Sequence, residues 1–141
     1  MKLVVTFLML LMLTAAGAQS KKEVKEAHKL FKSEQYAEAI ALYEKFITIA
    51  PTNKNYAYKY GACLVMLNKN NEKALKYLLE LENQGESDKK IAYFIGRAYE
   101  NDGSFEKALN YYERFKDVAD KEQIKKLKIK KRIRACKKAL R

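Results

Sequence analysis

Apolar residues recur along residues 20–120 at the three- and four-residue spacing of amphipathic helices. One sequence motif occurs three times: an alanine, an aliphatic residue directly after it, and large apolar residues at the fourth and seventh positions beyond the alanine. The alanines are Ala39, Ala74 and Ala108, separated by 35 and then 34 residues. No window has the sustained two-residue alternation of a half-buried strand. The pattern predicts an all-α fold whose unit repeats along the chain.

A second set of positions, upstream of each alanine motif, carries the small residues Ala27, Gly61 and Gly96. We expect each unit to be a pair of helices in which this small residue faces the alanine of the second helix, so that the two backbones approach closely. The large residues after the alanine are expected to fill the gap to the next unit. Turn-forming residues place the three units at about 20–53, 54–88 and 89–120.

Residues 121–141 carry eleven Lys or Arg and one Glu, a net charge of +10 out of +12 for the whole chain. Ile129, Ile133, Cys136 and Leu140 form one apolar stripe, which predicts a single helix that caps the last unit. The basic side chains are either a solvated outer face or a contact for an anionic partner, such as lipid headgroups or lipopolysaccharide. No aromatic residues interleave them, so nucleic acid is not an expected partner. The candidate basic positions are Lys125, Lys128, Lys131, Arg132 and Arg134.

Residues 1–18 have the pattern of a cleavable signal peptide. A short positive start precedes an apolar run of eleven residues, 3–13, and Ala16 and Ala18 supply small side chains before the cleavage point. The alternative is a membrane anchor, but a spanning helix needs about 20 apolar residues. We therefore expect an exported, periplasmic protein, with association with the outer membrane as a variant of this hypothesis.

The sequence has no recognisable catalytic or metal-binding constellation. His28 is the only histidine, and no phosphate loop or nucleophile motif occurs. We expect no enzyme activity, no cofactor, no metal and no small-molecule substrate. Cys63 and Cys136 could form a disulfide in an exported protein. Stacked units touch mainly their neighbours, however, and this bond would skip a layer, which favours two free thiols.

The period and the pattern of small and aromatic residues resemble a tetratricopeptide repeat (TPR) array over residues 20–120. The chain departs from the family at the fourth position of each unit, where no Trp occurs, and at Asn71, which stands where an aromatic is usual. The resemblance implies an α-solenoid of three helix pairs followed by the capping helix. It also implies that the first helices line a concave groove that binds protein segments.

Carried over by position, the groove would present residues from all three units: Lys21, Val24, His28, Phe31, Asn55, Tyr58, Ala62, Val65, Lys90, Tyr93, Arg97 and Asn101. Two stacked tyrosines, Tyr58 and Tyr93, beside Lys90 and Arg97 would suit an extended segment with an acidic end. The alternative is that these are ordinary exposed helix residues. The clamp that some relatives use for C-terminal carboxylates is incomplete, because Lys59 and Phe94 replace its Asn and Arg.

The order of signal, short array and Ile133-x-x-Cys136 helix, with Cys63 after Gly61-Ala62, also resembles the N-terminal module of a Bacteroidota envelope family. In those proteins the module usually precedes a β-propeller and a peptidoglycan-binding OmpA-like domain, and one branch serves type IX secretion. This sequence stops at Arg141, before any such domain. We therefore expect either a stand-alone relative of the family or a truncated N-terminal module of a larger outer-membrane-associated protein. The sequence predicts a non-catalytic scaffold of the cell envelope that binds a partner protein in its groove, or an envelope-surface binder acting through its basic helix.

Overall fold

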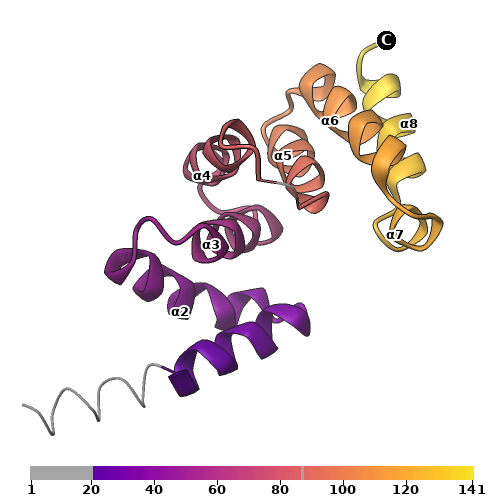
Figure 1. The fold of residues 1–141 in the computed structure, drawn as a ribbon. Helices are drawn as coiled ribbons and strands as arrows, with labels where there is room; N and C mark the ends of the chain where they lie inside the picture. Colours follow the sequence, from indigo (N-terminus) through magenta and orange to yellow (C-terminus); the bar gives the residue numbers. More distant parts are fainter. Residues whose placement is uncertain (1–20, 87) are drawn as a thin grey trace, which may run out of the picture.

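The computed structural model describes residues 21–86 and 88–141, which form eight helices and no strand. Among the described residues, the first helix covers 21–32. It is followed by α2 (Tyr36–Ile49), α3 (Lys54–Met66), α4 (Asn71–Asn83), α5 (Lys90–Asn101), α6 (Phe105–Val118), α7 (Lys121–Lys126) and α8 (Ile129–Ala139). Helix pairs stack in sequence order from the first helix to α6, as Figure 1 shows. The predicted all-α, TPR-like fold is confirmed, whereas the predicted signal peptide lies outside the described residues.

The helix ends follow local chemistry that the sequence already carries. The Asn53 side chain accepts a hydrogen bond from the Tyr56 N–H (3.1 Å) at the start of α3. Asn70 does the same for the Lys73 N–H (3.0 Å) at the start of α4, and its positive φ of 44° is one that asparagine tolerates. Gly103, with a φ of 75°, makes the tight turn between α5 and α6.

In the second and third pairs, the glycine of the first helix lies against the large residue at the fourth position after the alanine. A Cβ placed on Gly96 would lie 2.9 Å from Cε1 of Tyr112, and one placed on Gly61 would lie 3.1 Å from Cγ of Leu78. Tyr112 and Leu78 are fully buried. These side chains therefore cover the small residue of their own pair, while Tyr43 and Phe46 of the first pair also contact Tyr56 of the next unit, as expected.

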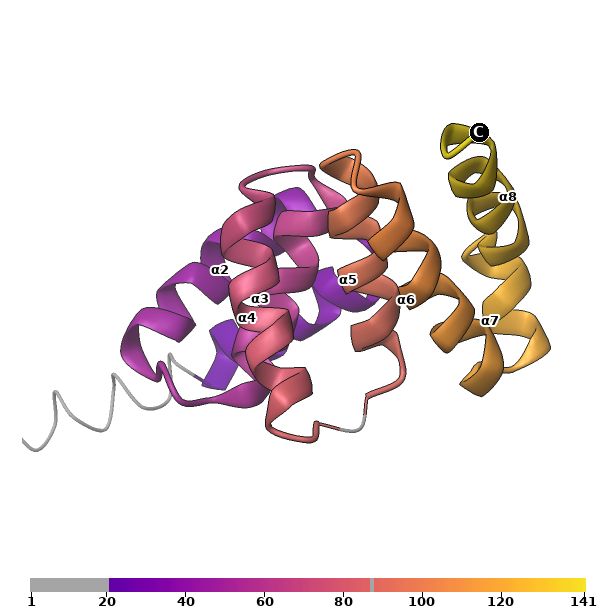
Figure 2. The ribbon, with the colours of Figure 1, turned by 90° about the horizontal axis from the view of Figure 1, so that it is seen from above.

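The stacking places the first helices of the second and third pairs side by side, because α3 contacts α5 as well as α2 and α4. The core is continuous through the array, from Ala27 in the first helix to Cys136 in α8. Seen from above, α7 and α8 continue the array beyond α6 (Figure 2). The first helix of each pair, which is the first helix of the chain, α3 or α5, lies on one concave side of the array.

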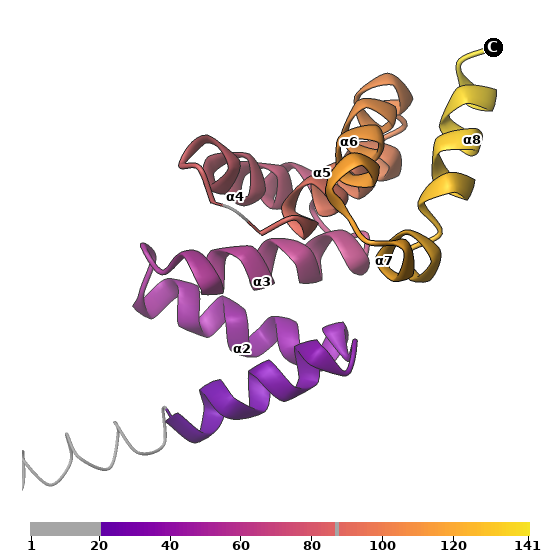
Figure 3. The ribbon, with the colours of Figure 1, turned by 45° about the vertical axis from the view of Figure 1, so that its right-hand side comes forward.

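The C-terminal segment is two helices, which corrects the prediction of a single one. Asp120 starts α7 with a capping box, and Lys128, at a φ of 55°, separates α7 from α8. This left-handed residue redirects the chain, so that α8 packs on α6 while α7 is set at an angle to it (Figure 3). Ile129, Ile133 and Cys136 are buried as predicted, but Leu140 is 50% exposed and lies outside the packed stripe.

Both cysteines are free and buried, as the layer argument favoured. Burial raises the pKa of the Cys63 thiol from 9.0 to about 12. Burial likewise raises the pKa of Tyr36 and of Tyr111 from 10.0 to about 12, with nearby carboxylates adding to the shift. These groups are neutral when protonated, so the folded state favours their protonated form.

We expect this burial to make the protein sensitive to alkali. The stabilising contribution of these groups is complete below about pH 9 and is lost as the pH rises toward about 12, since the unfolded chain ionises first. Urea unfolding followed by circular dichroism should give a falling midpoint across this window, and Cys63 should resist thiol reagents until the protein unfolds. A constant midpoint, or a Cys63 that reacts in the native state, would contradict the burial described here.

Candidate partner-binding groove

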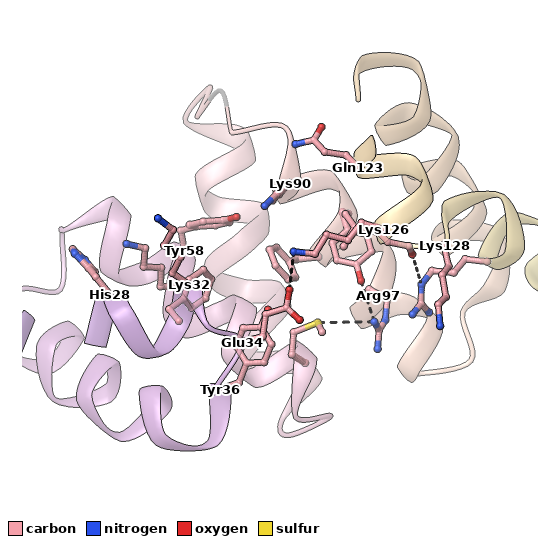
Figure 4. Close-up of a pocket in the computed structure, with 17 residues that line it drawn as sticks. His28, Lys32, Glu34, Tyr36, Tyr58, Lys90, Arg97, Gln123, Lys126 and Lys128 are labelled. Carbon is pink, nitrogen blue, oxygen red and sulfur yellow. Dashed lines mark hydrogen bonds and ion pairs between the residues drawn. The ribbon is translucent and has the colours of Figure 1, made fainter. Parts of the chain in front are cut away.

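A cavity of about 710 Å³ opens on the concave side of the array. It is bounded by the first helix and the turn after it, by α3 and α5, and by α7 and α8 at the C-terminal end (Figure 4). Its lining residues are His28, Phe31, Lys32, Glu34, Tyr36, Tyr58, Lys59, Met66, Lys90, Tyr93, Phe94, Arg97, Gln123, Lys126, Leu127, Lys128 and Arg132.

Half of the twelve predicted groove residues line the cavity. His28, Phe31, Tyr58, Lys90, Tyr93 and Arg97 line it. Asn55 lies beside it, with its Nδ2 3.4 Å from Nε2 of His28. Lys21 and Val24 are not among the lining residues. Three of the four predicted positions in the third unit line the cavity, compared with two in the first unit and one in the second.

Three predicted groove positions point into the protein. Ala62 and Val65 have no exposed surface, because α3 is packed between α2, α4 and α5. The Asn101 side chain donates to the Val65 carbonyl (3.1 Å) and to Oδ1 of Asn71 (3.2 Å). These residues serve the contact between the second and third pairs, which corrects their assignment to the groove.

The basic segment divides between the cavity and the outer surface. Lys128 and Arg132 line the cavity, whereas Lys125, Lys131 and Arg134 are exposed and do not. Arg132 is half-buried, and its Nη1 lies 2.7 Å from Oε2 of Glu100 in α5. That carboxylate oxygen also accepts a hydrogen bond from the Tyr112 hydroxyl in α6. Glu100 thus ties α8 to the third pair.

The sequence did not indicate that α7 forms a wall of the groove. Gln123, Lys126 and Leu127 line the cavity from this side, and Lys126 Nζ lies 3.0 Å from Oε1 of Glu34 in the turn after the first helix. This ion pair, visible in Figure 4, joins opposite ends of the array. The pair depends on the orientation of α7, a short helix that starts at the capping box of Asp120 and ends before the break at Lys128.

An aromatic floor runs across the cavity. The ring centroids of Phe31 and Tyr58 are 6.3 Å apart, those of Tyr58 and Phe94 are 5.8 Å apart, and those of Phe94 and Tyr93 are 5.1 Å apart. Phe94 therefore lies between the two tyrosines that the sequence suggested would stack directly on each other. Phe31 and Tyr58 are partly exposed and offer most of its contact area, whereas Tyr93 and Phe94 of α5 are only 3% and 4% exposed and support them from below.

The charges around this floor are strongly unbalanced. Seven lysines and arginines line the cavity: Lys32, Lys59, Lys90, Arg97, Lys126, Lys128 and Arg132. Glu34 is the only carboxylate among the lining residues, and it is paired with Lys126. Burial and the nearby Lys59 charge lower the pKa of His28 below its usual 6.5, and burial lowers the pKa of Lys59. A hollow surface of one sign attracts a partner of the opposite sign.

Within residues 21–86 and 88–141, no cluster of three or more His, Cys, Asp and Glu side chains could hold a metal ion. No helix in the described part of the chain is both long enough and apolar enough to span a membrane.

Comparison with known proteins identifies the same class of repeat. Residues 92–126, which include α6 and α7, match the tetratricopeptide repeat family. Two uncharacterized TPR repeat-containing proteins of Arabidopsis thaliana are each 29% identical to this chain over 94 residues. The match spans 63% of this chain and 12% of the length of each relative.

Solved TPR structures share the fold. The TPR domain of P58(IPK) superposes with a TM-score of 0.70 at 16% identity, over 86% of this chain and 34% of that one. The Sgt2 TPR domain of Aspergillus fumigatus gives 0.62 at 20% identity, over 86% and 79%. The TPR2AB domain of yeast Sti1, in a complex with pHSP90, gives 0.56 at 27% identity, over 88% and 48%. The chain is thus an all-α protein with a TPR-like fold, a class that is typically non-catalytic and mediates protein–protein interaction.

Proposed function

We propose that the protein is a non-catalytic scaffold that binds an extended, acidic segment of a partner protein in its concave cavity. The observation that carries this proposal is a lining of seven cationic side chains and one carboxylate around an aromatic floor, in which, among the described residues, only Lys126 and Arg132 have a carboxylate within 3.0 Å. The complex of yeast Sti1 with pHSP90 supports it, since that related fold also engages a protein partner.

In this mechanism the aromatic floor provides contact area and the surrounding cations select for acidic side chains. Tyrosine and phenylalanine lose few rotatable bonds on binding, and arginine and lysine pair with carboxylates. The Glu34–Lys126 pair is more than half exposed on both sides, at 56% and 66%. Such a pair is worth only about 0.2–1 kcal/mol, so an entering carboxylate can displace Glu34 from Lys126.

We expect replacement of Tyr58 by alanine to weaken binding of an acidic probe by about tenfold, the effect of removing a central interface aromatic. The measurement is fluorescence anisotropy with a labelled decapeptide of alternating glutamate and alanine, compared with one of alternating lysine and alanine. Tyr111→Ala is the matched control, because Tyr111 lies on α6 outside the cavity and bonds to Glu82 (2.8 Å).

Binding of the acidic peptide should also weaken as salt is added, since exposed charges are screened. The groove mechanism is rejected if the lysine peptide binds as well as the glutamate peptide. It is also rejected if Tyr58→Ala and Tyr111→Ala, both checked for native melting, reduce the affinity equally.

We also propose that this interaction takes place in the cell envelope. The support is the signal-like pattern of residues 1–18 and the resemblance to envelope proteins of Bacteroidota. Intact-mass analysis of the native protein from fractionated cells tests the idea. A soluble periplasmic species that begins at Gln19 supports a stand-alone adaptor, and a much larger species in the outer-membrane fraction supports a module of an anchored protein. A cytoplasmic species that retains Met1 would reject export.

A second candidate function is supported by the outer face of α8. Lys130, Arg134 and Lys138 are exposed at four-residue intervals, where like charges repel one another along a helix. An anionic lipid or lipopolysaccharide surface would relieve this repulsion, with about 1 kcal/mol per basic residue near the membrane.

Co-sedimentation with vesicles tests the surface-binding candidate. We expect binding to phosphatidylglycerol vesicles but not to phosphatidylcholine vesicles, and loss of that binding in the double variant Arg134→Glu, Lys138→Glu. The control Lys69→Glu, Lys76→Glu makes the same charge change at exposed positions away from α8. If both double variants lose vesicle binding equally, the binding depends only on net charge, and a site on α8 is rejected.

A further inference from the structure

One cationic side chain of the cavity lacks the partners that its burial calls for. Arg97, in α5, has a side chain only 17% exposed. Its Nη1 donates to the Tyr93 hydroxyl (3.1 Å) and lies 3.9 Å from Sδ of Met66, a weak acceptor. Its Nε is buried and has no hydrogen-bond acceptor among the described residues. A guanidinium carries five N–H donors, so most of its capacity is unused.

The nearest carboxylate is already engaged elsewhere. Oε2 of Glu100 lies 3.8 Å from Nε of Arg97, beyond hydrogen-bonding distance. The same oxygen is 2.7 Å from Nη1 of Arg132 and accepts a hydrogen bond from the Tyr112 hydroxyl. A movement of Glu100 toward Arg97 would strain both of these bonds. Because a poorly compensated buried charge is costly, the site favours an additional anion.

We propose that Arg97 is the anchor for a carboxylate of the bound segment, at the end of the cavity formed by α5 and α8. A guanidinium pairs with a carboxylate through two parallel N–H bonds, which suits a side chain with free donors. Tyr93 is only 3% exposed, but its hydroxyl oxygen accepts a hydrogen bond from Arg97, which leaves the hydroxyl proton as a further donor beside the guanidinium. Lys128 lines the same cavity and adds positive charge.

This inference rests on the proposed function only for the source of the carboxylate. The anion site itself can be tested without knowing the partner. Benzoate is a suitable probe, because it joins a carboxylate to an aromatic ring of the kind that the floor accepts. Benzamide is its neutral counterpart, and inorganic phosphate represents a free oxyanion that is not part of a protein segment.

The experiment is a titration of the ¹⁵N-labelled protein, followed through the side-chain Nε–Hε signals of arginine. The variant Arg97→Lys assigns the Arg97 signal by its disappearance, and it keeps the charge while removing the planar fork. We expect a saturable shift of the Arg97 signal with benzoate and almost none with benzamide. Benzoate affinity, read from backbone amide shifts, should fall by about tenfold in Arg97→Lys, as for loss of a charged hydrogen bond.

Arg114→Lys is the matched control, because Arg114 is paired with Glu82 (2.8 Å) outside the cavity. Its benzoate affinity should equal that of the unmodified protein. The inference is overturned if benzoate does not shift Arg97 saturably, if Arg97→Lys binds benzoate unchanged, or if phosphate binds more tightly than benzoate. In the last case the site serves free oxyanions.

The same variants separate this inference from the function on which it rests. If the acidic decapeptide depends on Tyr58 but not on Arg97, the anchor is wrong and groove binding stands. If benzoate saturates the Arg97 signal while the decapeptide does not bind, the carboxylate site stands and the proposed segment binding fails.

Discussion

Replacement of Gly96 by alanine should lower the free energy of unfolding by about 1–2 kcal/mol, because an overpacking cost at the upper end of the usual range, about 2–3 kcal/mol, is offset in part by the better helix propensity of alanine, about 1 kcal/mol. The added Cβ would lie 2.9 Å and 3.0 Å from two carbons of the Tyr112 ring and 3.3 Å from Cβ of Tyr111. Tyr112 is fully buried and also bonded to Glu100, so its ring has little room to move. The loss exceeds the gain of about 1 kcal/mol that alanine brings to a helix. Urea unfolding measures the change.

Gly61→Ala is the matched control in the preceding pair. Its Cβ would approach Cγ and Cδ2 of Leu78 at 3.1 Å and 3.3 Å, contacts that a branched aliphatic side chain can relieve by a small rotation. We expect the stability of this variant to stay within about 1 kcal/mol of the unmodified protein, because the strain and the helix propensity oppose each other. A Gly96→Ala protein as stable as the unmodified one would contradict the tight crossing of α5 and α6.

Replacement of Glu100 by glutamine should cost about 1.5–3 kcal/mol, the range for hydrogen bonds to charged groups. Glu100 is the shared partner of Arg132 in α8 and Tyr112 in α6, and it lies 3.8 Å from Nε of Arg97. Glutamine keeps the shape of the side chain but leaves the two guanidinium groups without a counter-charge. The midpoint of urea unfolding and the hydrogen exchange of α8 amides should both report the loss.

Glu113→Gln is the control for this prediction. It removes the exposed pair with Lys137, whose side chain is 54% exposed, and should change stability by less than about 1 kcal/mol. If the two variants lose equal stability, or if exchange in α8 does not accelerate in Glu100→Gln, then Glu100 does not hold α8 on the array.

The repeating part of the fold could be predicted from the sequence because its determinants are local and periodic. The alanine motif and the upstream small residues determine which faces of the two helices in a pair meet. Asparagine and glycine mark the turns between helices. The break at Lys128 could not be predicted in this way, since neither glycine nor proline occurs there. It is fixed by tertiary packing, in which Ile129 and Ile133 are buried and Arg132 reaches Glu100.

The groove was predicted in part for a related reason. Helical spacing identifies which residues share a face, and Tyr58, Tyr93 and Arg97 do line the cavity, although Tyr93 is only 3% exposed. It does not say how much of that face a neighbouring helix covers, and so it assigned the buried Ala62 and Val65 to the groove. The contribution of α7 depends on contact between distant parts of the chain, Glu34 and Lys126, which no local pattern encodes.

The most direct test of the central claim is a selection of random decapeptides displayed on phage against the immobilised protein, with the sequences of the binders read at the end. Our account predicts binders rich in aspartate and glutamate, whose binding weakens in Tyr58→Ala and persists in Tyr111→Ala. Binders without acidic enrichment, or acidic binders that retain full affinity for Tyr58→Ala, would contradict the proposal that the concave cavity recognises an acidic segment.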